Sequence, residues 1–301
     1  MLVSIIILTK NEVQNIGRCL GGVFKQQHSF DLEVIVIDSS STDGTLDVVN
    51  RYPVRIVEIK PDEFHHAGTR NLGAALAKGE ILVYLAGDAY PADSSWLSSL
   101  ISNFSDEMVA AVYGRQIPPS DINPVNRFRV SWHYNDRRKI QSKESMLIYG
   151  IPKVYYFSDV NSAVRKCIWR RFKFPEEVLF YEDVGLVTKI IDNGYKVIYE
   201  PLSRVYHAHN HSVVQIFQRY FDTARNYKTL GFFKNSKAGK INSEGIQFLF
   251  SGIMSLIHNG KIVWIPYFIV FTGFGFLGLK LGIYAEKIPD PIRRLCSEHG
   301  M

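Results

Sequence analysis

Short apolar runs alternate with amphipathic segments through the first two hundred residues, and this alternation constrains the fold more than any other feature of the chain. Segments with apolar residues at helical spacing, such as Val13–Phe24 and Ala67–Ala77, separate runs that have the composition of buried strands. The pattern predicts an α/β fold with a mostly parallel, doubly wound sheet. The predicted strands are Val3–Leu8, Glu33–Ile37, Val54–Val57, Ile81–Leu85, Ala110–Tyr113, Asp159–Val164 and Lys196–Tyr199.

Carboxylates stand at the ends of two predicted strands. In doubly wound sheets, ligands bind outside the carboxyl ends of the strands, and Asp38 and Asp88 both fall at such ends. The first strand-to-helix turn, Leu8–Glu12, contains no glycine. This absence argues against a dinucleotide-binding fingerprint and against a P-loop, because both need glycine where the backbone approaches phosphate.

Each of these two carboxylates has a structural and a functional interpretation. Asp38 either caps its own Ser/Thr-rich loop or accepts the N3–H of a pyrimidine base. Asp88 is either a solvated loop residue or a ligand to Mg²⁺ or Mn²⁺, which prefer oxygen ligands and usually keep contacts to substrate phosphates.

Two further charged positions lie at predicted helix starts. Glu182 and Asp183 either complement a helix dipole or supply a general base, for which Asp183 is our candidate. Arg70 is either a solvated surface residue or a cationic contact for an anionic donor.

Three histidines, His207, His209 and His211, alternate along one segment. In an extended chain this spacing places them on one face, and we expect at least one to contact a metal ion or a phosphate. The chain's cysteines, Cys19, Cys167 and Cys296, lie far apart, so the sequence suggests neither a zinc site nor a disulfide framework and fits a reducing compartment.

The net charge of +6 comes from the C-terminal part, because residues 211–301 contain 11 basic and 5 acidic side chains. Within it, Ile262–Leu279 has no charged residue for 18 positions, close to the about 20 that span a bilayer. A spanning, a re-entrant, an interfacial and a buried helix all stay open. Basic residues among apolar runs favour an anionic membrane surface over nucleic acid.

We expect an α/β domain over residues 1–212 and a helical, membrane-associating region over 213–301. Prolines and aromatic residues interrupt the alternation at 115–157, which we interpret as an insertion near the site.

Taken together, the motifs resemble family 2 glycosyltransferases with the GT-A fold, a Rossmann-like architecture. The resemblance covers about residues 3–212, where the family's elements occur in order. They are Thr9-x-Asn11-Glu12, Asp38-Ser39-x-Ser41-x-Asp43-Gly44, Arg70-Asn71-x-Gly73, Asp88 and Glu182-Asp183.

Bacterial rhamnosyltransferases of this family are the most similar group. They share the segments Phe64–Asn71, Gly87–Ala89, Asn161–Arg165 and His207–Ser212. Gly87 stands where those enzymes usually have glutamine, and no tryptophan follows Glu182-Asp183.

The resemblance implies inverting transfer of a sugar, rhamnose being one candidate, from a nucleoside diphosphate donor to a hydroxyl of a saccharide or lipid-linked acceptor. It implies that the enzyme works in cell-surface polysaccharide synthesis, at the cytoplasmic side of the cell membrane. Mg²⁺ or Mn²⁺ would offset the charge of the leaving diphosphate.

The same resemblance implies a role for each site residue. Donor-binding residues are Thr9, Asn11, Glu12, Asp38, Arg70 and Asp88; metal ligands are Asp88 with His207 or His209; and Asp183 is the general base. Two other classes stay open. A sugar-phosphate nucleotidyltransferase is expected to have a glycine-rich basic loop after its first strand, which is absent here, and a non-catalytic nucleotide-sugar binding protein would need no general base.

Overall fold

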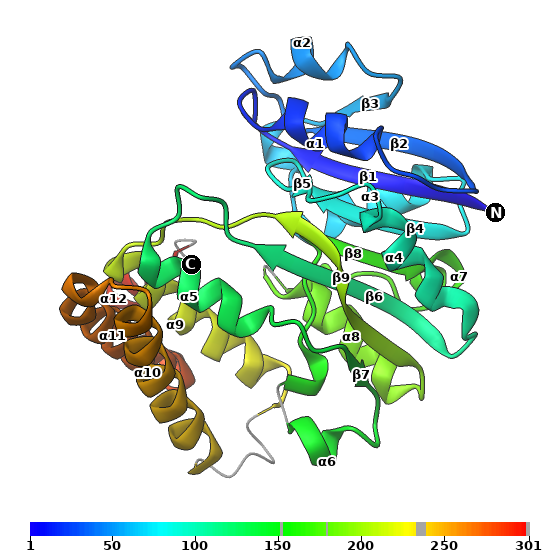
Figure 1. Ribbon diagram of the computed structural model, residues 1–301. Coiled ribbons are helices and arrows are strands. Elements are labelled where there is room, and N and C mark those ends of the chain that lie inside the picture. Colours follow the sequence, from blue (N-terminus) through cyan, green and yellow to red (C-terminus); the bar gives the residue numbers. More distant parts are fainter. Residues whose placement is uncertain (151–152, 179, 233–238, 299–301) are drawn as a thin grey trace. The chain divides into compact units, whose positions relative to one another are not determined.

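The computed structural model describes residues 1–150, 153–178, 180–232 and 239–298 (Figure 1). The chain forms two compact units. The first contains Met1–Ile117 and Tyr134–His207, and the second contains Pro118–His133 and Ala208–Met301. The chain therefore passes between the units three times. The sequence-based limits of 1–212 and 213–301 stay a prediction, and the structural division differs from them chiefly at 118–133.

The first unit is built on one sheet, to which nine strands of the described residues belong. Their order is β3-β2-β1-β4-β8-β6-β9-β5, and β7 pairs with β9. The strands are β1 (Leu2–Thr9), β2 (Asp31–Asp38), β3 (Arg55–Glu58), β4 (Ile81–Ala86), β5 (Tyr90–Pro91), β6 (Val109–Ile117), β7 (Lys139–Gln141), β8 (Asn161–Arg165) and β9 (Lys196–Tyr206).

The expected parallel arrangement is found in one half of the sheet. Strands β3, β2, β1 and β4 are parallel neighbours, whereas β8 is antiparallel to both β4 and β6, and β6 runs parallel to β9. The sheet is thus α/β as predicted but mixed, because β8 enters between β4 and β6 in the opposite direction. The helices of this unit are α1 (Ile16–Val23), α2 (Thr45–Val49), α3 (His66–Leu76), α4 (Trp96–Ile101), α6 (Met146–Tyr149), α7 (Lys166–Phe172) and α8 (Glu182–Asp192).

Strand β1 lies inside the sheet and is covered on both faces. Its consecutive residues Ile5, Ile6 and Ile7 are completely buried, which explains why the strand is a continuous apolar run rather than an alternating one. Helices α1 and α4 supply Leu20 and Trp96 to the cluster on one face. A central, rigid strand therefore holds the edge where the carboxyl ends of β1, β2 and β4 meet.

A buried hydrogen-bond network joins β8, β9 and α4. The Asn161 side chain accepts a hydrogen bond from Trp96 Nε1 (2.8 Å) and donates one to the carbonyl oxygen of Ser203 (3.0 Å). Gly114 leaves room for it, because a Cβ there would lie 2.3 Å from that carbonyl oxygen. The pairing of β6 with β9 shifts register between Gly114 and Arg115, so this bulge sits beside the network.

The second unit consists of helices α5 (Pro124–His133), α9 (Val213–Thr229), α10 (Gly239–His258), α11 (Ile265–Ile283) and α12 (Asp290–Cys296). Residues 118–133 group with it because the Phe128 ring packs against those of Phe248 and Phe268, with centroids 5.2 and 5.6 Å away. Within the described ranges, one stretch, Ile262–Ile283, is long and apolar enough to cross a membrane.

We predict that Asn161→Ala lowers the free energy of unfolding by about 3 kcal/mol, because it leaves the Trp96 N–H and the Ser203 carbonyl unpaired in the core and opens a small cavity. Denaturant unfolding of the purified chain measures this change. Asn193→Ala, which removes an exposed amide after α8, serves as control and should cost less than about 0.5 kcal/mol. Equal losses for the two variants would contradict a structural role for the Asn161 network.

Candidate active site

Two loops at the carboxyl ends of β1 and β2 interlock through side chain to backbone hydrogen bonds. Asn11 Oδ1 accepts from the Thr42 N–H, and the Asn11 N–H donates to Ser41 Oγ. The N–H of Glu12 donates to Thr45 Oγ1, and that of Val13 to Asp43 Oδ2. Asn11 takes a φ of 54°, a conformation that asparagine tolerates better than most residues. The motif at Thr9–Glu12 and the motif at Asp38–Gly44 therefore hold each other's loops in place.

Asp38, at the end of β2, is completely buried and caps its own loop. Its carboxylate accepts hydrogen bonds from the backbone N–H and the hydroxyl of Ser41. The strand order places β1 between β2 and β4, so the strand ends that carry Asp38 and Asp88 are two strands apart, roughly 10 Å. Binding of a base by Asp38 stays a prediction.

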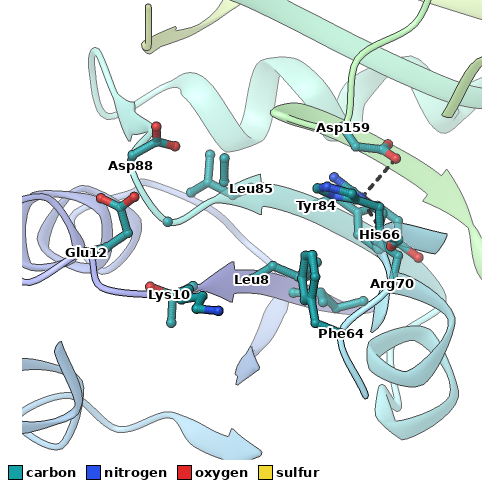
Figure 2. A pocket seen from close by; sticks show the side chains of 14 residues that line it. Leu8, Lys10, Glu12, Phe64, His66, Arg70, Tyr84, Leu85, Asp88 and Asp159 are labelled. Atoms are coloured by element: carbon teal, nitrogen blue, oxygen red, sulfur yellow. Dashed lines mark hydrogen bonds and ion pairs between the residues drawn. The ribbon is translucent and has the colours of Figure 1, made fainter. Parts of the chain in front are cut away.

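A pocket of about 250 Å³ opens where β1 and β4 end. Figure 2 shows the carboxylates of Glu12 and Asp88 on one side, and Arg70 with Asp159 on the other. Lys10, Phe64 and His66 also line it.

The Thr9 hydroxyl lies in the floor of this pocket. Thr9 is buried, and its Oγ1 has no hydrogen-bond partner among the described residues. Gly87 packs directly against it, since a Cβ on Gly87 would lie 3.0 Å from both Thr9 Oγ1 and the Leu8 carbonyl oxygen. A buried hydroxyl in need of a partner fits a polar ligand.

Asp88 and His207 come together as the sequence suggested. His207 Nε2 lies 3.5 Å from Asp88 Oδ2, and its Nδ1 lies 2.9 Å from Gln116 Oε1. The Gln116 amide nitrogen donates to Tyr134 Oη and Ser158 Oγ, so its Oε1 accepts from the imidazole. The tautomer that satisfies this network carries its N–H on Nδ1, and the Nε2 lone pair then lies on the side of Asp88.

Such an arrangement suits a metal ion. Metal-binding histidines usually donate their other ring N–H to an oxygen acceptor, which fixes the ring, and Gln116 provides that acceptor. Burial raises the pKa of Glu12, which also lines the pocket, and the negative charge of Asp88 adds to this shift. Carboxylate and imidazole groups that converge in this way favour a cation between them.

His209 follows His207 by two residues but belongs to the second unit. Two residues of extended chain span at most about 7 Å, so the covalent chain keeps His209 near His207. Its part in a metal site stays a prediction. His211 is buried, and its carbonyl oxygen accepts from the Asn126 side chain within the second unit.

Arg70 binds carboxylates of the protein itself. Its Nε lies 3.1 Å from Asp159 Oδ2, and its NH1 lies 2.6 Å from Glu182 Oε1 and 3.1 Å from the carbonyl oxygen of His66. The sequence predicted that Arg70 contacts an anionic ligand at this helix start. The anions found there are carboxylates of the protein: Asp159, just before β8, and Glu182, the first residue of α8. Arg70 therefore orients an acidic cluster beside the pocket.

Asp183 lies half-buried in this cluster, next to Glu182 at the start of α8. Burial raises its pKa well above the usual range, and the charges of Glu182 and Asp159 act in the same direction, whereas Arg70 opposes them. Burial likewise raises the pKa of Asp159 to about 6, with Arg70 again opposing the shift. Tyr181, just before the pair, has a φ of 66°, a strained conformation of the kind found at functional sites.

The structure thus gathers Thr9, Glu12, Asp88 and His207 at one end and Arg70 and Asp183 at the other. Asp159, Glu182 and Gln116 contribute to the site but were not among the predicted site residues. Glu182 could have been found from the acidic pair itself. Asp159 and Gln116 carried no local signal, because their roles arise from contacts with Arg70 and His207.

Comparisons with known proteins identify the family of the chain. The family model for glycosyl transferase family 2 matches residues 4–177. The chain is 35% identical over 268 residues to the O-antigen chain rhamnosyltransferase WbaN of Salmonella anatum, covering 88% of this chain and 84% of that protein. It is 34% identical over 292 residues to the O-antigen chain rhamnosyltransferase RfbN of Salmonella typhimurium, covering 96% and 92%.

Solved structures show the same fold. The mannosyltransferase PcManGT from Pyrobaculum calidifontis, in complex with GDP-Man and Mn²⁺, aligns with a TM-score of 0.64 at 20% identity, covering 95% of this chain and 88% of that one. Staphylococcus aureus TarS 1-349 in complex with UDP aligns with a TM-score of 0.56 at 16% identity, covering 95% and 91%. The predicted family resemblance and GT-A fold are confirmed.

We predict that Arg70→Gln raises the titration midpoint of the Asp183 carboxyl, because it removes the positive charge that opposes protonation. Asp159→Asn should lower the same midpoint, because it removes a negative charge. Carboxyl ¹³C chemical shifts of the labelled chain, followed as a function of pH, measure both. Arg55→Gln, an exposed arginine of β3, should leave the midpoint in place. Shifts of the same sign in Arg70→Gln and Asp159→Asn would rule out the electrostatic account.

Proposed function

The chain belongs to glycosyltransferase family 2, and from this premise we propose that it transfers a sugar, with inversion, from a nucleoside diphosphate donor bound in this pocket to an acceptor hydroxyl. The observation that carries the proposal is the pairing of Asp88 with His207 Nε2 at the end of β4, opposite an acidic cluster that contains Asp183. One end of the pocket suits a diphosphate, and the other suits the removal of a proton.

The donor would lie across the ends of three strands. Its base would reach the interlocked loops near Asp38 and Asn11, and its diphosphate would reach Asp88. The roughly 10 Å between the ends of β2 and β4 is comparable to the length of a nucleoside with its first phosphate. Thr9, on the strand between them, offers its unpaired hydroxyl to the ribose or the first phosphate.

The residues around Asp88 fit Mg²⁺ or Mn²⁺. Asp88 and His207 would hold the ion, and His209 would be a third ligand. When bound, the ion offsets the negative charge that develops on the departing diphosphate. Gln116 supports it indirectly by fixing the His207 ring, and Glu12 adds negative charge nearby.

Asp183 would accept the proton of the attacking hydroxyl. A raised pKa makes its carboxylate a stronger base while it is ionised, which is useful near neutral pH. The positive charge of Arg70 opposes that shift and favours the ionised carboxylate. A single displacement needs no covalent intermediate, and one base is enough.

The relatives suggest the biological setting. WbaN and RfbN are O-antigen chain rhamnosyltransferases, and at this level of identity over most of both chains we propose a rhamnosyl donor here. We propose a saccharide, carried on a lipid, as acceptor. The basic and apolar second unit supports a location at the cytoplasmic side of the cell membrane.

We predict that Asp183→Asn lowers turnover at least about 100-fold while donor binding is kept, because asparagine preserves the shape but cannot take the proton. Metal-dependent protection from thermal unfolding by a panel of nucleotide sugars first identifies the donor. Turnover with that donor is then compared in the wild type, Asp183→Asn and the exposed control Glu177→Gln, which should behave as the wild type. Wild-type turnover in Asp183→Asn would rule out Asp183 as the general base. A wild-type chain that binds the donor but shows no turnover would be a binding protein.

We also predict that Gln116→Leu weakens Mn²⁺ binding about 10- to 100-fold, since the His207 ring loses the acceptor that orients it. Calorimetric titration with Mn²⁺ in the absence of donor measures the affinity independently of activity. Tyr134→Phe, which removes another partner of the same amide, is the matched control and should have a much smaller effect. Unchanged affinity in Gln116→Leu would place the ion elsewhere.

A further inference from the structure

Helix α11 presents a continuous apolar face to solvent. Ile269, Val270, Phe274, Leu277 and Leu281 are exposed and recur at helical spacing, and Gly273 lies among them with open space around it. Only 22% of the most apolar window of this segment is buried inside the structure. A patch of this kind on one helix marks an interaction surface rather than a protein core.

The opposite face of α11 is locked against α9. A Cβ on Gly278 would lie 2.2 Å from the carbonyl oxygen of Phe217, and one on Gly282 would lie 2.2 Å from that of Phe221. The two backbones are therefore in direct contact, and the order of these contacts shows that the helices run in the same direction. α9 and α11 consequently form one rigid pair.

Helix α9 carries charges that a bilayer interior does not accept. Asp222 accepts hydrogen bonds from the Ser297 hydroxyl and the Glu298 N–H, and Arg225 lies 3.8 Å from it. Arg219 pairs with Glu298. These contacts tie α9 to the segment after α12, with Asp222 buried among them and the Arg219 side chain about half exposed, so charged groups occupy successive turns of α9.

A spanning α11 would therefore draw Arg219, Asp222 and Arg225 into the hydrocarbon or would have to separate from α9. The first outcome places several charges in the bilayer interior, where they are most costly. The second exposes Gly278 and Gly282, at which the two backbones meet. The first outcome is therefore unfavourable, and the second breaks the observed packing of α11 on α9.

We propose that α11, together with the exposed stripe of α10, binds the surface of an anionic lipid bilayer and lies in its plane. α10 adds Ile246, Phe250, Met254 and Ile257, spaced at four, four and three residues, and contacts α11 where the Phe248 and Phe268 rings meet at 5.7 Å. The exposed side chains enter the boundary between headgroups and acyl chains, and α9 stays on the water side.

Charge complementarity identifies the lipid. Lys280 extends over the Phe276 ring at 5.1 Å, beside the apolar face, and Lys287 over that of Tyr284 at 5.6 Å. In the described ranges, neither lysine forms an ion pair, nor do Lys261 and Arg294, whereas Glu286 pairs with Lys228 and Asp290 with Arg293. Unpaired cations on apolar stems at the rim of an apolar face suit anionic headgroups.

The turn between α10 and α11 argues against a re-entrant hairpin. Asn259, Gly260 and Lys261 are exposed at its tip, and a hairpin that dips into the bilayer would bury this lysine deepest. In-plane binding keeps this lysine at the level of the headgroups, outside the hydrocarbon.

This inference rests on the membrane-side location proposed above, but its tests need no turnover, so the two proposals fail separately. The purified full-length chain should bind vesicles of phosphatidylethanolamine with phosphatidylglycerol, and bind phosphatidylcholine vesicles more weakly. The double variant Ile269→Gln/Leu277→Gln should lose affinity at least about tenfold. Leu147→Gln/Leu202→Gln, which changes two leucines of the first unit that are even more exposed, is the control and should bind as the wild type.

A second variant covers the case in which the double variant unfolds. Lys261→Glu/Lys280→Glu should weaken binding to the anionic vesicles and leave binding to phosphatidylcholine unchanged. A wild-type chain that binds neither kind of vesicle, or charge reversal without effect, would overturn the lipid assignment.

Topology is tested with single cysteines at both ends of α11. In a chain with Cys167→Ser and Cys296→Ser, a membrane-impermeant maleimide should label both Val263→Cys and Tyr284→Cys in inverted inner-membrane vesicles. Labelling of the two positions from opposite sides would show a spanning helix, and protection of position 263 would show a re-entrant one. Either result would overturn in-plane binding.

Discussion

The buried pairing of Arg70 with Asp159 and Glu182 is the interaction on which the site depends. It joins three segments that are far apart in the chain: helix α3, the residues before β8 and the start of α8. Three carboxylates meet beside this one guanidinium, and removing one partner of such a buried set typically costs 3–5 kcal/mol because the remaining charges stay uncompensated. The same arrangement sets how readily Asp183 takes a proton, so stability and chemistry are coupled at this point.

The other end of the pocket depends on strand pairing rather than on charge. β6 and β9 run parallel and shift register by a bulge, which brings Gln116 next to His207 at their ends. The imidazole is thereby oriented by a neutral hydrogen bond and turned toward Asp88. One end of the pocket is thus suited to a cation through a fixed imidazole and a carboxylate, and beside the other end lies a cluster with an excess of acid, to which we assign the proton transfer.

Sequence reasoning located seven of the nine described strands of the sheet but missed the short strands β5 and β7. It also singled out Asp88 and His207, which the structure brings together, because strand ends and alternating histidines are local signals. It identified Arg70 as a residue that meets anions but not which ones, since Glu182 lies 112 positions away. The interior place of β8 was not predictable, because the direction of a strand within a sheet leaves no mark in five residues of mixed polarity. For Asp38, the loop-capping interpretation describes the hydrogen bonds that the structure contains.

The interlocked loops after β1 and β2 have a consequence for how the molecule assembles. Backbone N–H groups of the loop after β1 donate to side chains of the loop after β2. In the other direction, the Asn11 side chain accepts a hydrogen bond from the backbone of the second loop. Neither loop can therefore adopt its final shape while the other is unformed. We expect this corner to form in one cooperative step, once two segments that are distant in the sequence have met.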